Sequence, residues 1–141
     1  MGPVTVYLAD TSAWHRSQLP AIAQLWQSRL GEDTLGTCAQ VLLEILFSAQ
    51  SRKDYDRLAA ELKALHQLPC GAEEFDRALD VQRRLAARGA LHHRSVKIAD
   101  LIVAASAESG EAVVWHYDED FDRIAAVTNQ ATEWVAPKGS L

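Results

Sequence analysis

Two carboxylates lie inside stretches of sequence that are otherwise apolar. Asp100 interrupts the run Ile98–Ala105, and Glu44 interrupts the run Val41–Phe47. Moving an unpaired charge into an apolar environment is very unfavourable, so each carboxylate requires a compensating group. The only lysine or arginine three or four residues from either acid is Lys97, which precedes Asp100 by three positions.

Further acids stand at the ends of stretches that look like β-strands. Asp10 ends the run Val4–Ala9, and the acidic cluster 118–122 directly follows the run 112–116. Any one of these acids could be a helix N-cap, or could pair with the backbone or a distant arginine. A single cause that accounts for all of them is a divalent cation, which lets carboxylates share a site where one would otherwise have to protonate.

A site built from carboxylates alone favours Mg²⁺ or Mn²⁺ over zinc. Such ions lower the pKa of a water molecule and stabilise the departing oxygen of a phosphodiester. Other chemistries lack their motifs, because the chain has no glycine-rich phosphate loop, no G-x-S-x-G and no H-E-x-x-H. His92 and His93 are adjacent and point apart, and no cluster of cysteines and histidines completes a zinc site.

Composition indicates one globular domain over residues 1–141, with 136–141 as a tail. The chain is 48% hydrophobic, but none of its apolar stretches is long enough to span a membrane, and we expect no secretion signal. Cys38 and Cys70 read as buried thiols of a cytoplasmic protein. The net charge of −5 disfavours polyanion binding unless positive charge is local or metal ions bridge the phosphates.

Strands and helices are expected to alternate along the chain. The expected strands are 4–8, 34–37, 66–68, 112–116 and 132–135, and the expected helices are 20–31, 38–49, 54–65, 73–88 and a helix capped by Ser95 that stops at Gly110. This alternation predicts an α/β fold with a parallel sheet. Asp10 and Asp118 follow strand ends, which share one edge of such a sheet, and the helices of Glu44 and Asp100 begin near that edge. The four carboxylates are therefore expected to meet.

Four segments of the chain, in this order, resemble those of PIN-domain ribonucleases, most closely the VapC toxins of bacterial toxin–antitoxin pairs. The segments are Leu8–Ser12, Val41–Phe47, Ile98–Ala105 and Asp118–Phe121, and the resemblance extends over residues 4–135. It implies a PIN-like three-layer sandwich, in which a short, mostly parallel central sheet is flanked by helices.

The resemblance also implies roles for particular residues. The catalytic and metal-binding acids would be Asp10, Glu44, Asp100 and Asp118, with Asp120 as a further metal ligand and with Ser12 and Thr11 as the neighbours that orient them. The family often has threonine or serine two residues before the last of the four acids. His116 stands there in this chain, and either replaces that contact or packs elsewhere.

The function that follows is a metal-dependent endoribonuclease acting as a toxin, which cleaves RNA phosphodiester bonds with metal-activated water. The resemblance implies a homodimer and a cognate antitoxin, for which the helix bearing Leu25 and Trp26 is expected to offer apolar surface. One alternative is a metal-dependent phosphatase, although its nucleophilic aspartate usually has a second aspartate two residues on, where Ser12 stands here. Another is a PIN-like binding scaffold without catalysis, for which converging carboxylates would serve no purpose.

Basic residues near the end of the helix 73–88 are candidates for RNA contacts. They are Arg84, Arg88, Arg94 and Lys97. The alternative is a solvated helix end whose positive charge complements the helix dipole.

Overall fold

The fold is built on a parallel five-stranded sheet in the order β3-β2-β1-β4-β5. The computed structural model describes residues 4–141, so the first three residues of the expected domain lie outside the described residues, and the single-domain assignment stays a prediction. The strands are β1 (Tyr7–Ala9), β2 (Leu35–Thr37), β3 (His66–Gln67), β4 (Val113–His116) and β5 (Thr132–Trp134). Every pairing is parallel, as the alternating pattern predicts.

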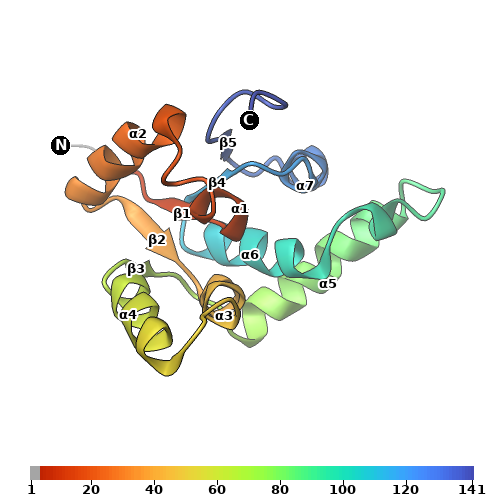
Figure 1. Ribbon diagram of the computed structural model, residues 1–141. Coiled ribbons are helices and arrows are strands. Elements are labelled where there is room, and N and C mark those ends of the chain that lie inside the picture. The colour runs from red at the N-terminus through yellow and green to blue at the C-terminus, as the bar shows by residue number, and fades with distance from the viewer. Residues whose placement is uncertain (1–3) are drawn as a thin grey trace.

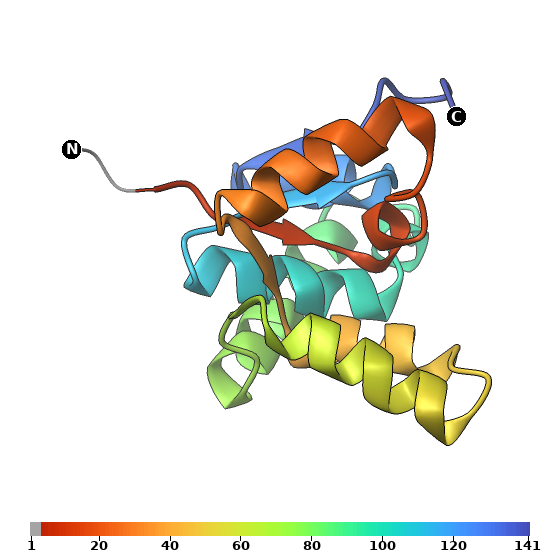
Figure 2. The ribbon, with the colours of Figure 1, turned by 60° about the vertical axis from the view of Figure 1, so that its left-hand side comes forward.

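Helices cover both faces of the sheet and make a three-layer sandwich. They are α1 (Thr11–Trp14), α2 (Pro20–Gly31), α3 (Ala39–Phe47), α4 (Arg52–Lys63), α5 (Ala72–Ala86), the 3₁₀ helix η1 (His92–Ser95), α6 (Ile98–Ser109) and α7 (Asp120–Thr128). Helix α2 lies on one side of the strands and α6 on the other (Figures 1 and 2). The expected α/β sandwich, with a short parallel sheet flanked by helices, is confirmed.

The two central strands bury side chains on both faces, as strands of a parallel sheet covered by helices do. Leu8 pairs with Val114, and both belong to the core beneath α6. Ala9 pairs with Trp115 on the opposite face, where the Trp115 ring stacks on Trp26 with centroids 5.4 Å apart. Trp26 is thus a core residue, whereas Leu25 and Leu30 of the same helix are exposed, so the expectation that this helix offers apolar surface to a partner stays a prediction.

Helix α6 is buried over most of its length. It begins later than the sequence indicates. It starts at Ile98, and the expected cap Ser95 instead lies in η1, where its Oγ donates to the carbonyl of His92. The residues from Asp100 to Ala107 are all buried. A Cβ at Gly110 would lie 2.8 Å from Leu68 Cδ2, so a larger residue at the end of α6 would make the Leu68 side chain shift.

Three further details differ from the expected elements. The first strand begins at Tyr7, and Val4 is exposed. Helices α1 and α7 were not expected, because α1 has only four residues and α7 begins inside an acidic cluster. The apolar run around Glu44 does not form a buried helix, since Leu43 and Phe47 of α3 are 67% and 93% exposed.

Candidate active site

Asp10 closes β1 and caps α1. Its Oδ1 accepts hydrogen bonds from Ala13 N (3.0 Å) and Ser12 Oγ (2.6 Å). Ser12 Oγ in turn accepts a hydrogen bond from Tyr117 N (2.8 Å), which ties the end of β1 to the end of β4. Burial raises the pKa of Asp10 to about 6, against the hydrogen bonds that favour its charged form.

Asp100 is the third residue of α6 and is only 7% exposed. Its Oδ2 accepts no hydrogen bond from the part of the chain that the structure describes. Burial raises the pKa of Asp100 to about 8, and a hydrogen bond with Asp120 also favours the protonated carboxyl. A buried oxygen without a hydrogen-bond donor is costly in a folded protein, and a cation or a proton on that oxygen would offset the cost.

Asp118 lies in the turn between β4 and α7, and Asp120 is the first residue of α7. Asp118 Oδ1 accepts a hydrogen bond from Asp120 N (2.9 Å), while Asp118 N donates to His116 Nδ1 (3.1 Å). Asp120 Oδ1 accepts from Arg123 Nη1 (3.0 Å), one turn further along α7. These bonds fix both carboxylates relative to the turn after β4 and the first turn of α7.

Lys97, the residue before α6, faces this group of acids. Its Nζ lies 2.7 Å from Asp118 Oδ2, 3.0 Å from Asp120 Oδ2 and 3.5 Å from Asp100 Oδ2. Burial works against the charge of Lys97, but the hydrogen bonds to Asp118 and Asp120 outweigh it and raise the pKa of the ammonium. Burial likewise works against the Asp120 carboxylate, and hydrogen bonds from Asp100 and Lys97 outweigh it and lower the pKa of Asp120. Lys97, a candidate for RNA contact by sequence, pairs with carboxylates in the structure, and its contact with RNA stays a prediction.

Glu44 reaches the site from α3 on the other side. Its Oε2 accepts a hydrogen bond from Thr11 Oγ1 (2.5 Å), and its Oε1 accepts one from Gln40 Nε2 (3.0 Å). Glu44 lines one cavity of about 360 Å³ together with Asp10, Asp100 and Asp118. The structure therefore brings the four expected carboxylates to one place, from four separate segments of the chain.

Within the described residues, one group of carboxylates is close enough to hold a metal ion. Oxygens of Asp100, Asp118 and Asp120 all lie within 4.8 Å of one another. The donors are hard oxygens, and the unpartnered Oδ2 of Asp100 lies among them, so the residues present fit a Mg²⁺ or Mn²⁺ ion. Asp10 and Glu44 line the same cavity outside this tight group.

Sequence reasoning missed three residues of the cavity wall, namely His15, Arg16 and Tyr117. The guanidinium of Arg16 lies over the Tyr117 ring, 4.5 Å from its centroid, and Arg16 Nη1 donates to the carbonyl of Ser12 (2.9 Å). The spacing of four residues between Ser12 and Arg16 is the signal that could have found this contact. It is visible only once the short helix α1 is known.

His116 is fully buried and packs between Phe121 and Trp134, with ring centroids 4.9 Å away on each side. Burial lowers the pKa of His116 to about 4, so the ring is neutral at physiological pH. A neutral ring can accept through Nδ1, and it does so from the backbone of Asp118. His116 thus supports the turn that carries Asp118.

The predicted arginines lie outside the acidic cavity. Arg84 pairs with Asp80 (3.0 Å), Arg88 Nη2 donates to the carbonyl of Ala126 (3.0 Å), and Arg94 is exposed. The structure therefore does not bring these arginines to the carboxylates, and a contact with RNA stays a prediction.

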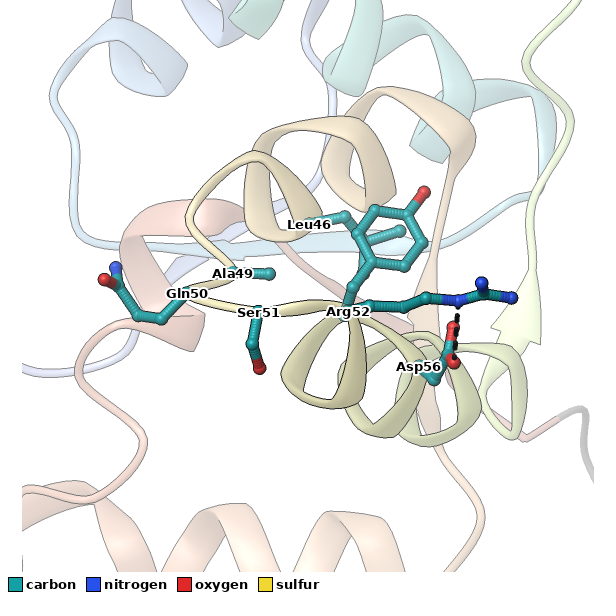
Figure 3. A pocket seen from close by; sticks show the side chains of 7 residues that line it. Leu46, Ala49, Gln50, Ser51, Arg52 and Asp56 are labelled. Carbon is teal, nitrogen blue, oxygen red and sulfur yellow. Dashed lines mark ion pairs between the residues drawn. The ribbon is translucent and has the colours of Figure 1, made fainter.

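A larger hollow of about 570 Å³ lies at the turn between α3 and α4. Leu46, Gln50, Arg52 and Asp56 line it, and Figure 3 shows the Arg52 and Asp56 side chains meeting on the α4 side, with their closest atoms 3.8 Å apart. Asp56 is the only acidic residue that lines this hollow, so the hollow lacks the converging donors of the acidic cavity.

Among the described residues, none of the helices has the length and hydrophobicity needed to cross a membrane.

The protein is a parallel α/β sandwich in which carboxylates gather at the carboxyl ends of β1 and β4. Such a group of carboxylate oxygens suits a hard cation. The model of the PIN domain matches residues 7–127, and the chain belongs to the PIN domain family. It is 55% identical to Ribonuclease VapC18 of Mycobacterium tuberculosis over 96% of this chain and 99% of that protein.

Solved structures agree with this assignment. The crystal structure of DNA bound VapBC from Salmonella typhimurium matches with a TM-score of 0.72 and 16% identity, over 94% of this chain and all of that one, which shows a shared fold. VapBC-5 of Mycobacterium tuberculosis, a member of the VapBC family of toxin-antitoxin systems, matches with a TM-score of 0.52 and 28% identity over 94% of this chain and 98% of that one.

Proposed function

We propose that this protein is a Mg²⁺- or Mn²⁺-dependent endoribonuclease and the toxin of a toxin–antitoxin pair. The observation that carries the proposal is the convergence of Asp10, Glu44, Asp100 and Asp118 on one cavity, where a buried oxygen of Asp100 accepts no hydrogen bond from the described residues. The ribonuclease name of a relative that is 55% identical over nearly the whole chain supports RNA as the substrate.

The residues divide the work by position. Asp100 and Asp118, with Asp120 as a further ligand, would hold the cation through carboxylate oxygens. A divalent ion there would lower the pKa of a water molecule and neutralise charge on the phosphodiester. Asp10, fixed by Ser12 and Ala13, orients water at the same edge of the sheet. Glu44, fixed by its bond from the Thr11 hydroxyl, closes the cavity from the α3 side.

Arg16 on the wall of the cavity gives an acidic protein local positive charge for a phosphate. It is held over the Tyr117 ring, where an RNA backbone would approach the acids. Cationic side chains position the backbone without reading the bases.

The alternatives are less well supported. A phosphatase that uses Asp10 as a nucleophile would usually have a second aspartate two residues on, and Ser12 stands there, donating to Asp10 Oδ1. A scaffold without catalysis gives no reason for a buried carboxyl with a raised pKa such as that of Asp100.

Partners follow from the toxin–antitoxin relatives. We infer a cognate antitoxin and a homodimer, in the cytoplasm. Exposed apolar side chains suited to such contacts are Leu43 and Phe47 on α3, Phe75 and Leu79 on α5, and Ile98 at the start of α6.

Cleavage assays with and without metal test the proposal. Purified protein is incubated with a folded RNA and separately with a phosphate monoester, in chelator or with Mg²⁺ or Mn²⁺. We expect internal RNA cleavage only with metal, and none by the Asp118→Asn variant, with Asp56→Asn as an active control from the distant hollow. Hydrolysis of the monoester alone would favour the phosphatase, and binding of RNA without cleavage in any metal would favour the scaffold.

A further inference from the structure

Lys97 is held at the amino end of α6 by both its backbone and its side chain. Its backbone N and its Nζ each donate to Asp120 Oδ2 at 3.0 Å, and Nζ also lies 2.7 Å from Asp118 Oδ2. The third carboxylate, Asp100, lies 3.5 Å from the same ammonium. One nitrogen therefore contacts all three carboxylates that could hold a metal ion.

A divalent cation and the ammonium require the same oxygens. Asp118 Oδ2 and Asp120 Oδ2 are the ammonium's nearest partners, and two positive charges held among these carboxylates would repel each other. The lysine head can leave, since its side chain is 64% exposed and its flexible stem carries a compact point charge. Its backbone bond to Asp120 does not depend on where the ammonium lies.

Asp120 keeps a second cationic partner when the ammonium leaves. Arg123 Nη1 donates to Asp120 Oδ1 at 3.0 Å, on the carboxylate oxygen that Lys97 does not use. Asp118 and Asp100 have no comparable arginine among the described residues. Departure of the ammonium therefore leaves the oxygens of Asp118 and Asp100 without a basic side-chain partner among the described residues, and a metal ion would bind at those oxygens.

We propose that Lys97 is the resident counter-cation of the metal site: its ammonium holds the three carboxylates together before metal binds, and an incoming divalent ion displaces it. This inference rests on the proposed metal-dependent function and adds a residue that sets the affinity for the metal. Displacement makes metal binding weaker than the carboxylates alone would give, because the ion must first break the bonds that the ammonium makes.

Thermodynamic linkage requires that the gain in metal affinity on removing the ammonium equal the loss in stability of the metal-free protein. We expect Lys97→Met to bind Mn²⁺ about tenfold more tightly, which corresponds to about 1.4 kcal/mol. The stability of the metal-free protein should fall by the same amount, or about 3–5 °C in melting temperature for a chain of this size. With saturating Mn²⁺ the variant and the wild type should melt together, because the displaced ammonium no longer contributes.

The experiment measures Mn²⁺ binding by titration calorimetry and melting temperature in chelator and in excess Mn²⁺. Lys97→Arg keeps the charge and should bind Mn²⁺ nearly as weakly as wild type. Lys138→Met is the matched control, because it removes an exposed lysine whose partner, Glu119, lies 2.6 Å away and outside the metal cluster. This control should leave the Mn²⁺ affinity unchanged.

The outcomes separate the two proposals. If the wild type binds Mn²⁺ and cleaves RNA, but Lys97→Met binds Mn²⁺ no more tightly or melts no lower in chelator, Lys97 is not a displaced counter-cation and the proposed function stands. Weaker binding by Lys97→Met would also overturn the inference, since it would show that the lysine assists the bound ion. If the wild type neither binds a divalent ion nor cleaves RNA, the proposed function fails and the inference fails with it.

Discussion

Replacing Asp100 with asparagine should make the metal-free protein more stable and abolish cleavage. The carboxyl is 7% exposed, and burial raises its pKa to about 8. Asparagine has nearly the same shape and cannot ionise, so it removes the cost of keeping this acid buried. It also removes an anionic oxygen ligand, and the proposed metal site should lose affinity with it.

The magnitude follows from the pKa of Asp100 in the two states. Folding moves that pKa from 3.8 to about 8, so at neutral pH the folded protein takes up a proton that the unfolded chain lacks. Each pH unit above the unfolded pKa costs about 1.4 kcal/mol, or roughly 4 kcal/mol at pH 7. The lowered pKa of Asp120, which depends in part on its hydrogen bond with Asp100, offsets part of this cost. We therefore expect Asp100→Asn to stabilise the metal-free protein by about 2–4 kcal/mol, or about 5–10 °C in melting temperature.

How the stability difference between Asp100→Asn and wild type changes with pH is a sharper test than its size at pH 7. An acid whose pKa is raised on folding destabilises the native state as pH rises from the unfolded pKa to the folded one. The melting temperatures of Asp100→Asn and wild type, both in chelator, should therefore coincide near pH 4 and separate towards pH 8. Asp56→Asn, whose side chain is 68% exposed, should follow the wild type throughout.

Two results would refute this reasoning. A stability difference that is the same near pH 4 and near pH 8 would show that ionisation of Asp100 is not its cause. Full RNA cleavage by Asp100→Asn would remove Asp100 from the proposed catalytic set, whatever the melting temperatures show.

Two further predictions concern the shared metal site and the basic residues. Asp118→Asn and Glu44→Gln should each remove part of the rise in melting temperature that Mn²⁺ produces, with Asp118→Asn removing most of it; the double variant should lose little more, and losses that add independently would argue against one site. Arg94→Ala should reduce the slope of log RNA affinity against log salt concentration by about one unit for each phosphate that the arginine neutralises. Arg52→Ala on α4 is the control and should leave this slope unchanged. Equal slopes for both variants would show that Arg94 is only part of a solvated helix end.

Much of the architecture follows from local patterns in the sequence. Alternating strands and helices predict the parallel sheet, because period-two and helical spacing are properties of short segments. The placement of Asp10 and Asp118 at one edge follows from the same pattern, since both residues come after strands that run in the same direction. Helices α1 and α7 escaped prediction because four residues carry no periodicity and acidic residues at a helix start resemble a loop.

Burial on helix faces could not be read from residue type alone. Leu25 and Trp26 are adjacent and both apolar, yet Leu25 is 42% exposed while Trp26 is stacked on Trp115 in the core. The direction of a helix face depends on how α2 crosses the sheet. His116 shows the same limit, because its neutral ring and its bond to the Asp118 backbone depend on the packing of Phe121 and Trp134 around it.

The sequence by itself indicated which acids belong together, because Asp10 and Asp118 follow strands of one parallel sheet and Asp100 interrupts an apolar run in which an unpaired charge would be costly. Only the tertiary structure decided which cation faces them. Lys97 and Asp118 are separated by 21 positions, and their distance of 2.7 Å depends on the turn after β4 packing against the amino end of α6. An ion pair of that kind arises from the relative placement of two elements, which a local pattern of residues does not contain.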